Sequence, residues 1–318
     1  MRNVVGALDL PSEAEEAAPA PRASESGADR SKERELPDPD ERGRAYEAMR
    51  ARVSAEARDG PEPGRLAETD RRSFWDEVPR FQKMWADYEK SWPKGRRPTA
   101  DRSADPSGSY RSDGGFHLSP GRHAEAVAAI GRVREAEPTI SAAVQRVEQE
   151  NRYGGWLEGF KCRLKGHDRL KEKIAEQQVV EPDKPASEVL RKIPDAIRYT
   201  FCFEPGNYTK GYYDIKERLE SHGYKMCHSK NWWTNPEYKG INTRWITAEG
   251  QRFEIQFHTA ESFHAKQYVT HDAYERIRNP LTKDEERGEL EAFQREVSSY
   301  IEIPEGAADI PDFKKKGF

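Results

Sequence analysis

Large hydrophobic residues are few in the first 70 positions and become dense and patterned after that. Residues 1–70 are rich in Pro, Ala, Glu, Asp and Arg, and such a segment cannot bury enough apolar surface to offset the entropy of ordering. We predict disorder there. Between 71 and 92, aromatic residues recur at near-helical spacing and predict a helix. It either packs on the main domain or docks a partner, and a linker rich in Pro, Gly, Ser and Asp follows at 93–115.

The pattern becomes helical after Leu118. Ser119 is a suitable N-cap, and Pro120 then stands at the first helical position, where its missing N–H costs nothing. An apolar stripe continues from there, and Pro138 is expected to divide it into two helices. Two shorter charged helices are expected at about 166–178 and 185–192.

The following region changes in kind, because β-branched and aromatic residues replace the helical stripe. A buried strand at 196–203 precedes a crossover helix at 208–221. Further strands are expected at 224–231, 241–247 and 252–258, and then helices near 261–269 and 273–278. The tail, 281–318, is charged and is interpreted as a solvated surface. The order of elements predicts an α/β fold with a mixed sheet of four to five strands flanked by helices. The predicted regions are 1–70 (disordered), 71–117 (aromatic helix and linker), 118–280 (main domain) and 281–318 (tail).

Charge, cysteine content and hydropathy exclude several classes of protein. The 318 residues carry a net charge of -4, so any polyanion site must be a local concentration of Lys and Arg. Three cysteines without CxxC spacing indicate reduced thiols rather than a disulfide frame or a zinc site. No apolar stretch approaches the ~20 residues of a membrane span, and the first residues lack a secretory signal. We expect a soluble cytoplasmic protein without a membrane partner; export by a route without a classical signal stays open.

A dense run of cations lies between 161 and 173. Like charges four residues apart repel on a helix, so local stability does not explain the run. A triphosphate would explain it, and the alternative is a solvated helix balanced by Asp168 and Glu172. The run consists of Lys161, Arg163, Lys165, Arg169, Lys171 and Lys173.

Carboxylates mark a second candidate site. Alternation along 252–258 places Glu254, Gln256 and His258 on one face of the last strand. Asp195, at the head of the first strand, is a second carboxylate that folding could bring near Glu254. Two carboxylates plus substrate phosphates are the usual way to hold Mg²⁺. A plain surface strand would look similar.

The loop 230–240 combines aromatic and cationic residues. Tyr238 lies between Pro236 and Gly240, beside Lys239, with Lys230 at the start of the loop. Such a loop suits a base-stacking platform near a phosphate clamp. Alternatively, the aromatic side chains cover a sheet edge.

Taken in order, these segments resemble the synthetase domain of the RelA/SpoT superfamily over residues 118–278. The resemblance implies a nucleotidyltransferase-like sheet, and five segments carry it in the correct order. They are Arg163-Leu164-Lys165 with Arg169 and Lys173 (R-x-K-x3-S-x3-K), Asp195-Ala196-Ile197-Arg198, Lys230, Tyr238-Lys239-Gly240-Ile241-Asn242 (G-Y-x-S-x-H), and Glu254-Ile255-Gln256-Phe257-His258-Thr259 (E-[VI]-Q-[IL]-R-T).

The resemblance implies transfer of pyrophosphate from ATP to the 3′-hydroxyl of an acceptor, and it assigns roles. Asp195 and Glu254 would hold Mg²⁺, and Glu254 would also accept the hydroxyl proton. The ATP phosphates would bind Arg163, Lys165, Arg169 and Lys173. The acceptor would contact Tyr238, Lys230, Asn242, Gln256 and His258, with Tyr238 stacking on its base.

Several positions depart from the family pattern. Arg169 replaces Ser, Asn242 replaces His, and His258 replaces Arg. The separation from Asp195 to Arg198 is three positions, where the family has five. These variants resemble the small toxin-like and secreted members, and no hydrolase domain precedes the synthetase part.

The acceptor stays open at this point. It is a guanosine nucleotide (GDP or GTP), an adenosine nucleotide or the 3′ end of tRNA, and the product in the first case would be an alarmone such as ppGpp. A catalytically dead nucleotide-binding module is the non-enzymatic alternative. If the chain is a toxin or effector, an antitoxin or immunity protein is the expected protein partner.

Overall fold

The computed structural model describes residues 73–92, 107–112, 115–278 and 282–316, and its centre is a six-stranded mixed sheet. β4 (Arg198–Phe203) and β7 (Arg252–Thr259) run parallel in the middle, and the other neighbouring strands are antiparallel. The predicted mixed α/β class is confirmed, with six strands instead of four to five. The order is β3-β4-β7-β6-β5-β8, where β3 is Trp156–Glu158, β5 is Lys225–Asn231, β6 is Ile241–Ile246 and β8 is Phe313–Lys314; a separate ladder joins β1 (Tyr110–Arg111) and β2 (His117–Leu118).

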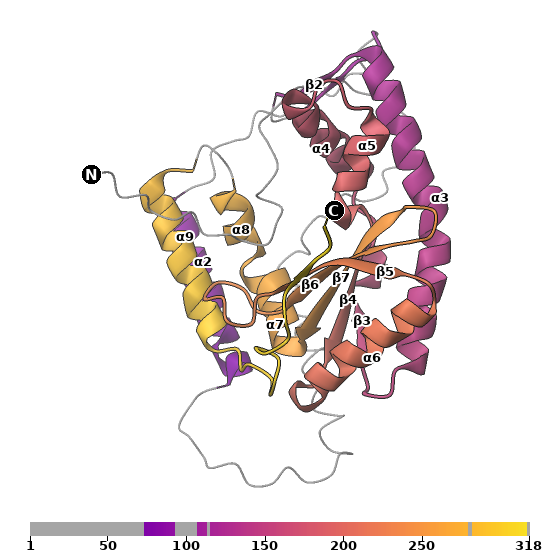
Figure 1. The fold of residues 1–318 in the computed structure, drawn as a ribbon. Helices are drawn as coiled ribbons and strands as arrows, with labels where there is room; N and C mark the ends of the chain where they lie inside the picture. The colour runs from indigo at the N-terminus through magenta and orange to yellow at the C-terminus, as the bar shows by residue number, and fades with distance from the viewer. Residues whose placement is uncertain (1–72, 93–106, 113–114, 279–281, 317–318) are drawn as a thin grey trace, which may run out of the picture.

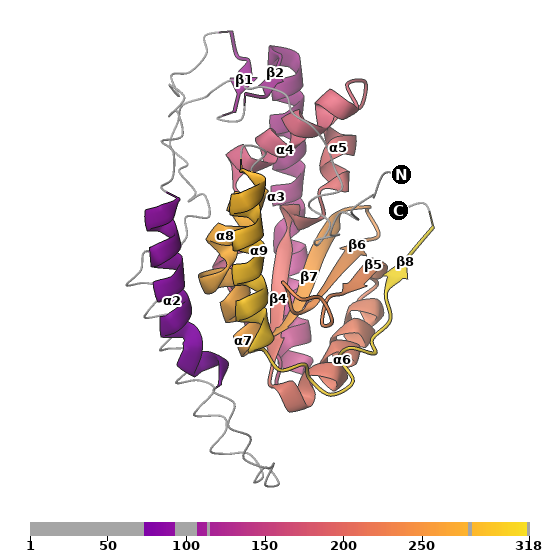
Figure 2. The same cartoon turned by 90° about the vertical axis from the view of Figure 1, so that its left-hand side faces the viewer.

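Helices lie on both sides of this sheet (Figure 1). The long α3 (Pro120–Glu150) and α6 (Tyr208–Ser221) cover one face, and α4 (His167–Val180) and α5 (Ala186–Lys192) pack on the upper half of α3. The other group, seen in the turned view of Figure 2, begins at the end of β7. It comprises α7 (Ala260–His264), a π-helical turn (Ala265–Val269), α8 (His271–Ile277), α9 (Asp284–Ser299) and α2 (Phe74–Ser91).

Alternation along the strands makes the face towards α3 and α6 apolar. Tyr199, Phe201 and Phe203 of β4 are buried on it, beside Ile255 and Phe257 of β7. Helix α6 approaches this layer closely at Gly211, where a Cβ atom would lie 2.1 Å from the Phe203 ring. Only glycine permits this approach.

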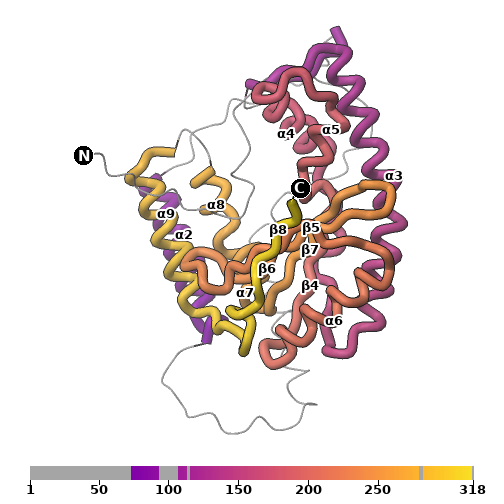
Figure 3. Tube along the Cα trace, viewed as in Figure 1, coloured from indigo at the N-terminus to yellow at the C-terminus, as the bar shows by residue number. Residues whose placement is uncertain are grey.

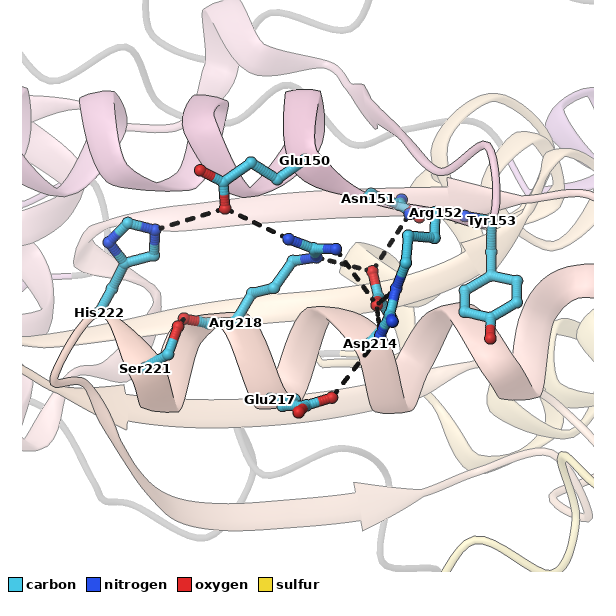
Figure 4. Close-up of polar contacts among 9 residues, drawn as sticks. All are labelled: Glu150, Asn151, Arg152, Tyr153, Asp214, Glu217, Arg218, Ser221 and His222. Atoms are coloured by element: carbon cyan, nitrogen blue, oxygen red, sulfur yellow. Dashed lines mark hydrogen bonds and ion pairs between the residues drawn. The ribbon is translucent and has the colours of Figure 1, made fainter.

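A buried carboxylate fastens α6 to the end of α3 (Figure 4). Asp214 of α6, with 1% of its side chain exposed, accepts hydrogen bonds from Nε of Arg152 at 2.7 Å and Nε of Arg218 at 2.8 Å. Arg218 also reaches Glu150, the last residue of α3, at 3.3 Å. Burial acts to raise the pKa of Asp214, but the bonds from Arg218 and Arg152 outweigh it and lower that pKa. The layer under the sheet is therefore fixed by paired charge as well as by apolar packing.

Several sequence expectations are confirmed. Helix 71–92 forms as α2, and it packs on the main domain through the buried Phe74, Val78 and Phe81. The crossover helix occupies 208–221 as predicted. The predicted disordered segment 1–70 lies outside the described residues. Among the described residues, no helix combines the length and the apolar character needed to cross a membrane.

Two expectations are wrong, and one strand was missed. Pro138 does not divide the helix: α3 is continuous, because the loss of one backbone hydrogen bond is offset by buried residues on both sides, including Val133 and Ile140. The short edge strand β3 was not expected. The tail is not a solvated surface, since α9 buries Leu290 and Val297 and the following chain returns along β5 as β8 (Figure 3).

Candidate active site

The face of the sheet opposite α3 and α6 carries polar residues in register across the strands. In one row, Glu254 of β7 lies between Arg198 of β4 and Arg244 of β6. In the next row, Gln256 lies beside Asn242, which in turn pairs with Lys230 of β5. Directly paired residues on neighbouring strands point to the same side of a sheet, so these rows form one polar surface.

Glu254 is 7% exposed and its carboxylate is held from the side. The Gln256 amide donates to Oε1 of Glu254 at 2.5 Å, and the Lys266 ammonium in turn donates to Oε1 of Gln256. In the strand register, Arg198 and Arg244 are the neighbours of Glu254 on the two adjoining strands. No hydrogen bond or ion pair engages the Arg198 side chain among the residues that the structure describes. Glu254 is therefore a buried carboxylate with a cationic residue beside it on each neighbouring strand.

Asp195 approaches the same end of the sheet from a neighbouring turn. Residues 194–196 form a 3₁₀ turn that lies against β7, and the peptide N–H of Glu254 donates to the carbonyl of Ile197 at 2.9 Å. Asp195 is 3% exposed and forms an ion pair with Lys165. The turn is helical, so the alternation of a strand does not set the direction of the Asp195 side chain.

The predicted cationic run divides into two parts. Residues 163–165 lie beside the start of β4 through a bridge between Leu164 and Ile197, and Gly166 then caps α4. Lys161, Arg163 and Lys165 therefore do not share a helix face with the cations of α4.

Arg163 points towards α3. Its Nε donates to Glu137 at 2.5 Å and to Ser141 at 3.1 Å, and its guanidinium lies 4.6 Å from the Phe160 ring centre. Ser141 also bonds the hydroxyl of Tyr199, which belongs to the apolar face of the sheet. Arg163 is thus tied to the side of the sheet opposite Glu254, whereas Lys165 is joined to Asp195.

Arg169 and Lys173 project from α4. Nη2 of Arg169 donates to Glu275 of α8 at 3.0 Å, and Nη1 lies 3.5 Å from Glu172. Lys173 is half-buried and makes no hydrogen bond or ion pair within the described part of the chain. Arg169 is therefore engaged by carboxylates, and Lys173 is available.

Tyr238 belongs to a network of polar contacts that includes Asn242 and His258. Its hydroxyl donates to Oδ1 of Asn242 at 2.9 Å and lies 3.1 Å from Nε2 of His258. On the other side of the ring, Nδ1 of His258 lies 2.9 Å from the Ser262 hydroxyl. Three of the predicted acceptor residues thus meet in one network.

His258 is fully buried in this network. Burial, followed by the charges of Lys266 and Arg198, holds its pKa well below the usual range, so the imidazole is neutral. Gly240 makes room for the ring, since a Cβ atom there would lie 2.8 Å from Cε1 of His258.

Lys230 lies at the outer edge of the polar surface. Its ammonium donates to Asp312 at 2.7 Å and lies 5.2 Å from the Trp232 ring centre. Asp312 precedes β8 and also accepts from the peptide N–H of Asn231 at 2.7 Å. The chain after α9 therefore contributes to the predicted acceptor side.

Sequence reasoning missed some of the groups around Glu254. Arg198 was noticed only as part of a motif, and Arg244 not at all, although Arg244 alternates with buried residues in its strand. Lys266 lies in the π-helical turn, seven positions after the end of β7. Alternation was a usable signal for Arg244, but the position of both arginines beside Glu254 follows from strand pairing.

The donor set fits Mg²⁺ bound together with a nucleotide. No group of three or more His, Cys, Asp or Glu side chains gathers as a metal site within the described ranges. Mg²⁺ commonly takes only one or two carboxylates, with substrate phosphates and water completing its shell. Glu254 and Asp195 at one end of the sheet match that pattern.

Comparison with known proteins yields likenesses of fold. No family model and no curated protein matches the chain. Among solved structures, it is similar to the type VI effector Tas1, seen in complex with its immunity protein, at 19% identity over 54% of this chain and 94% of that one, with a TM-score of 0.40.

Two further structures show the same kind of likeness. Small alarmone synthetase 1 from Bacillus subtilis, bound to its product pppGpp, aligns at 11% identity over 54% of this chain and 88% of that one, with a TM-score of 0.35. A GTP pyrophosphokinase family protein from Streptococcus pneumoniae aligns at 14% identity over 54% and 84%, with a TM-score of 0.36. Each likeness concerns about half of this chain.

Proposed function

We propose that this chain transfers pyrophosphate from ATP to the 3′-hydroxyl of a nucleotide in a Mg²⁺-dependent reaction. The observation that carries the proposal is the buried Glu254 in register between Arg198 and Arg244, beside the Lys165–Asp195 pair. A carboxylate with an arginine beside it on each neighbouring strand suits a reaction in which a triphosphate, a metal ion and a hydroxyl meet.

The chemistry is an in-line displacement at the β-phosphorus of ATP. A bond forms between the acceptor 3′-oxygen and the β-phosphorus, the bond from the β-phosphorus to the oxygen that bridges it to the α-phosphorus breaks, and AMP leaves. Glu254 accepts the proton of the hydroxyl. Arg198, Arg244 and Lys165 neutralise charge on the phosphates, and positioning contributes most of the remaining rate.

Magnesium has a limited part in this scheme. Glu254 and Asp195 would hold it, and the ion supplies charge neutralisation for the phosphate oxygens. Asp195 is joined to Lys165, so a metal ion held by Asp195 would take the place of Lys165 as its partner.

The remaining predicted residues divide between the two substrates. Arg169 and Lys173 of α4 bind the ATP phosphates. Tyr238 stacks on the acceptor base, while Asn242 and His258 fix its ring through the hydroxyl. Lys230 meets acceptor phosphates, and Gln256 orients Glu254. Arg163 has a structural part: it bonds Glu137 of α3 and thereby holds the segment that carries Lys165.

The decisive experiment uses the purified full chain with ATP, Mg²⁺ and one acceptor at a time: GDP, GTP, ADP, ATP or tRNA. Chromatography resolves AMP and the pyrophosphorylated product, and thereby identifies the acceptor class. Glu254→Gln should abolish transfer and leave the fold intact, whereas Glu249→Gln, at an exposed position in the β6–β7 turn, should behave as the wild type. Absence of AMP formation with every acceptor would favour a nucleotide-binding module instead.

A further inference from the structure

We propose that Glu237, anchored by Arg295 and Ser298 of α9, is a positioning residue that sets the Tyr238 ring for the acceptor base. This inference rests on the proposed function, in which Tyr238 stacks on that base. The residues that hold Glu237 are about 60 positions further along the chain, on a helix that the sequence analysis did not predict.

Hydrogen bonds within the loop 230–240 hold the backbone around Tyr238. The Asn235 side chain accepts hydrogen bonds from the peptide N–H groups of Glu237 and Tyr238, both at 2.9 Å. The Lys239 ammonium donates to the carbonyls of Trp233 at 3.1 Å and Asn235 at 2.7 Å. These bonds fix the backbone turn, but they do not fix where the turn stands on the sheet.

Helix α9 supplies that second constraint. Nη1 of Arg295 donates to Oε1 of Glu237 at 2.8 Å, and the Ser298 hydroxyl donates to the carbonyl of Glu237 at 2.8 Å. Both ends of Glu237, its side chain and its backbone, are therefore held by one helix. Its neighbour along the chain is Tyr238.

The energetics indicate that this anchor does more than stabilise the fold. The Glu237 side chain is 2% exposed, while Arg295 is 42% exposed. Removing a carboxylate from water costs several kcal/mol, and an ion pair often does no more than balance that cost. A neutral residue could fill this position without the desolvation cost. What a charged pair adds is a single defined position for the loop.

Helix α9 is itself held by α2. Nη2 of Arg80 donates to Glu296 at 2.7 Å, the Tyr88 hydroxyl donates to Glu286 at 2.6 Å, and the rings of Trp85 and Phe293 lie 5.8 Å apart. The two helices form a brace behind the loop. The brace thus holds Glu237, and the hydroxyl of its neighbour Tyr238 contacts Asn242 and His258.

Two substitutions test the role in the full chain. Arg295→Ala removes the charged partner, and Glu237→Gln keeps the shape and removes the charge. Each should raise KM for the acceptor about tenfold, the size expected when one charged hydrogen bond is lost. KM for ATP should change by less than about twofold, because the anchor does not contact the ATP side. Arg295→Lys should restore most of the acceptor affinity, because it keeps the charge.

The controls separate positioning from folding and from the proposed function. Arg132→Ala, at an exposed position of α3, is the matched surface change, and thermal melting confirms that each variant is folded. The acceptor is the fastest-used member of GDP, GTP, ADP, ATP and tRNA. If the wild type is active and the variants keep its KM for the acceptor, the positioning role is overturned. An equal loss of affinity for both substrates overturns it as well. Neither result affects the proposed function. A wild type that makes no AMP with any acceptor overturns the proposed function and this inference with it.

Discussion

Arg169 of α4 and Glu275 of α8 form an ion pair at 3.0 Å, although 106 positions separate them in the chain. The pair joins two groups of helices that stand on different sides of the polar surface (Figure 1). In the proposed function, Arg169 binds ATP phosphates, so the nucleotide must displace Glu275 from it. The ion pair therefore competes with the substrate.

Glu275→Gln should lower KM for ATP. The pair is partly exposed, with 52% of the Arg169 side chain and 31% of the Glu275 side chain accessible, so its contribution is at most about 1 kcal/mol, which corresponds to about a fivefold change. Initial-rate measurements against ATP check this, with the exposed Glu285→Gln of α9 as the control. An increase in KM would mean that Glu275 orders Arg169 for ATP instead of competing with it.

Arg198→Gln should reduce kcat by about a hundredfold or more, as expected for loss of a preorganised donor at developing charge. The residue makes no other side-chain bond within the described ranges, so the fold should persist. Single-turnover rates and a thermal melt check both parts. Arg198→Lys should recover part of the rate, and the exposed Arg146→Gln should leave it unchanged. Equal losses in stability and rate would point to a structural role.

Stability should fall as the pH is lowered from about 6.5, because His264 is buried neutral. Burial lowers its pKa to about 3, so between these values the unfolded chain binds a proton that the folded chain does not. The free energy of unfolding then decreases by up to about 1.4 kcal/mol for each pH unit. The ring centre lies 5.2 Å from that of Trp75, so protonation should also loosen α2.

Thermal melts from pH 7.5 to 4.5 measure this dependence. His264→Phe keeps an aromatic ring in the same setting beside Phe74 and Trp75 and removes the proton site, so its melting temperature should fall less steeply. Parallel curves for the two proteins would assign the acid sensitivity to other groups, such as His258 and His228, whose pKa values are also lowered.

Expression of the full chain in a bacterial host should slow growth, because the proposed reaction consumes ATP and converts a second nucleotide. The Glu254→Gln variant should be harmless at the same protein level. Growth curves and nucleotide pools measured by chromatography provide the readout. An equally toxic Glu254→Gln variant would separate toxicity from pyrophosphate transfer.

Local patterns predicted most of the central elements. The β-branched and aromatic residues in 196–203 and the helical pattern in 208–221 are properties of consecutive residues, and they predicted β4 and α6 nearly at their bounds. Helix α9 was hidden by its charge, although Leu290, Phe293 and Val297 recur at three and four positions.

The site was less accessible to sequence reasoning. Which residues flank Glu254 depends on the pairing of β4, β7 and β6, and packing of distant segments decides that register. The ion pair between Arg163 and Glu137 also depends on tertiary packing, because 26 positions separate the two residues in the chain. Residue types indicated the chemistry, and tertiary contacts decided which of them meet.

The continuous α3 has a mechanical consequence for the site. At 1.5 Å per residue, its 31 residues span about 45 Å, and this one rod supports both the sheet and the α4–α5 pair. Any movement that carries α4 away from the sheet must bend the rod or slide along it. Bending is easiest at Pro138, near the midpoint, where one backbone bond is already missing. The spacing between α4 and the sheet therefore depends on the stiffness of this single helix.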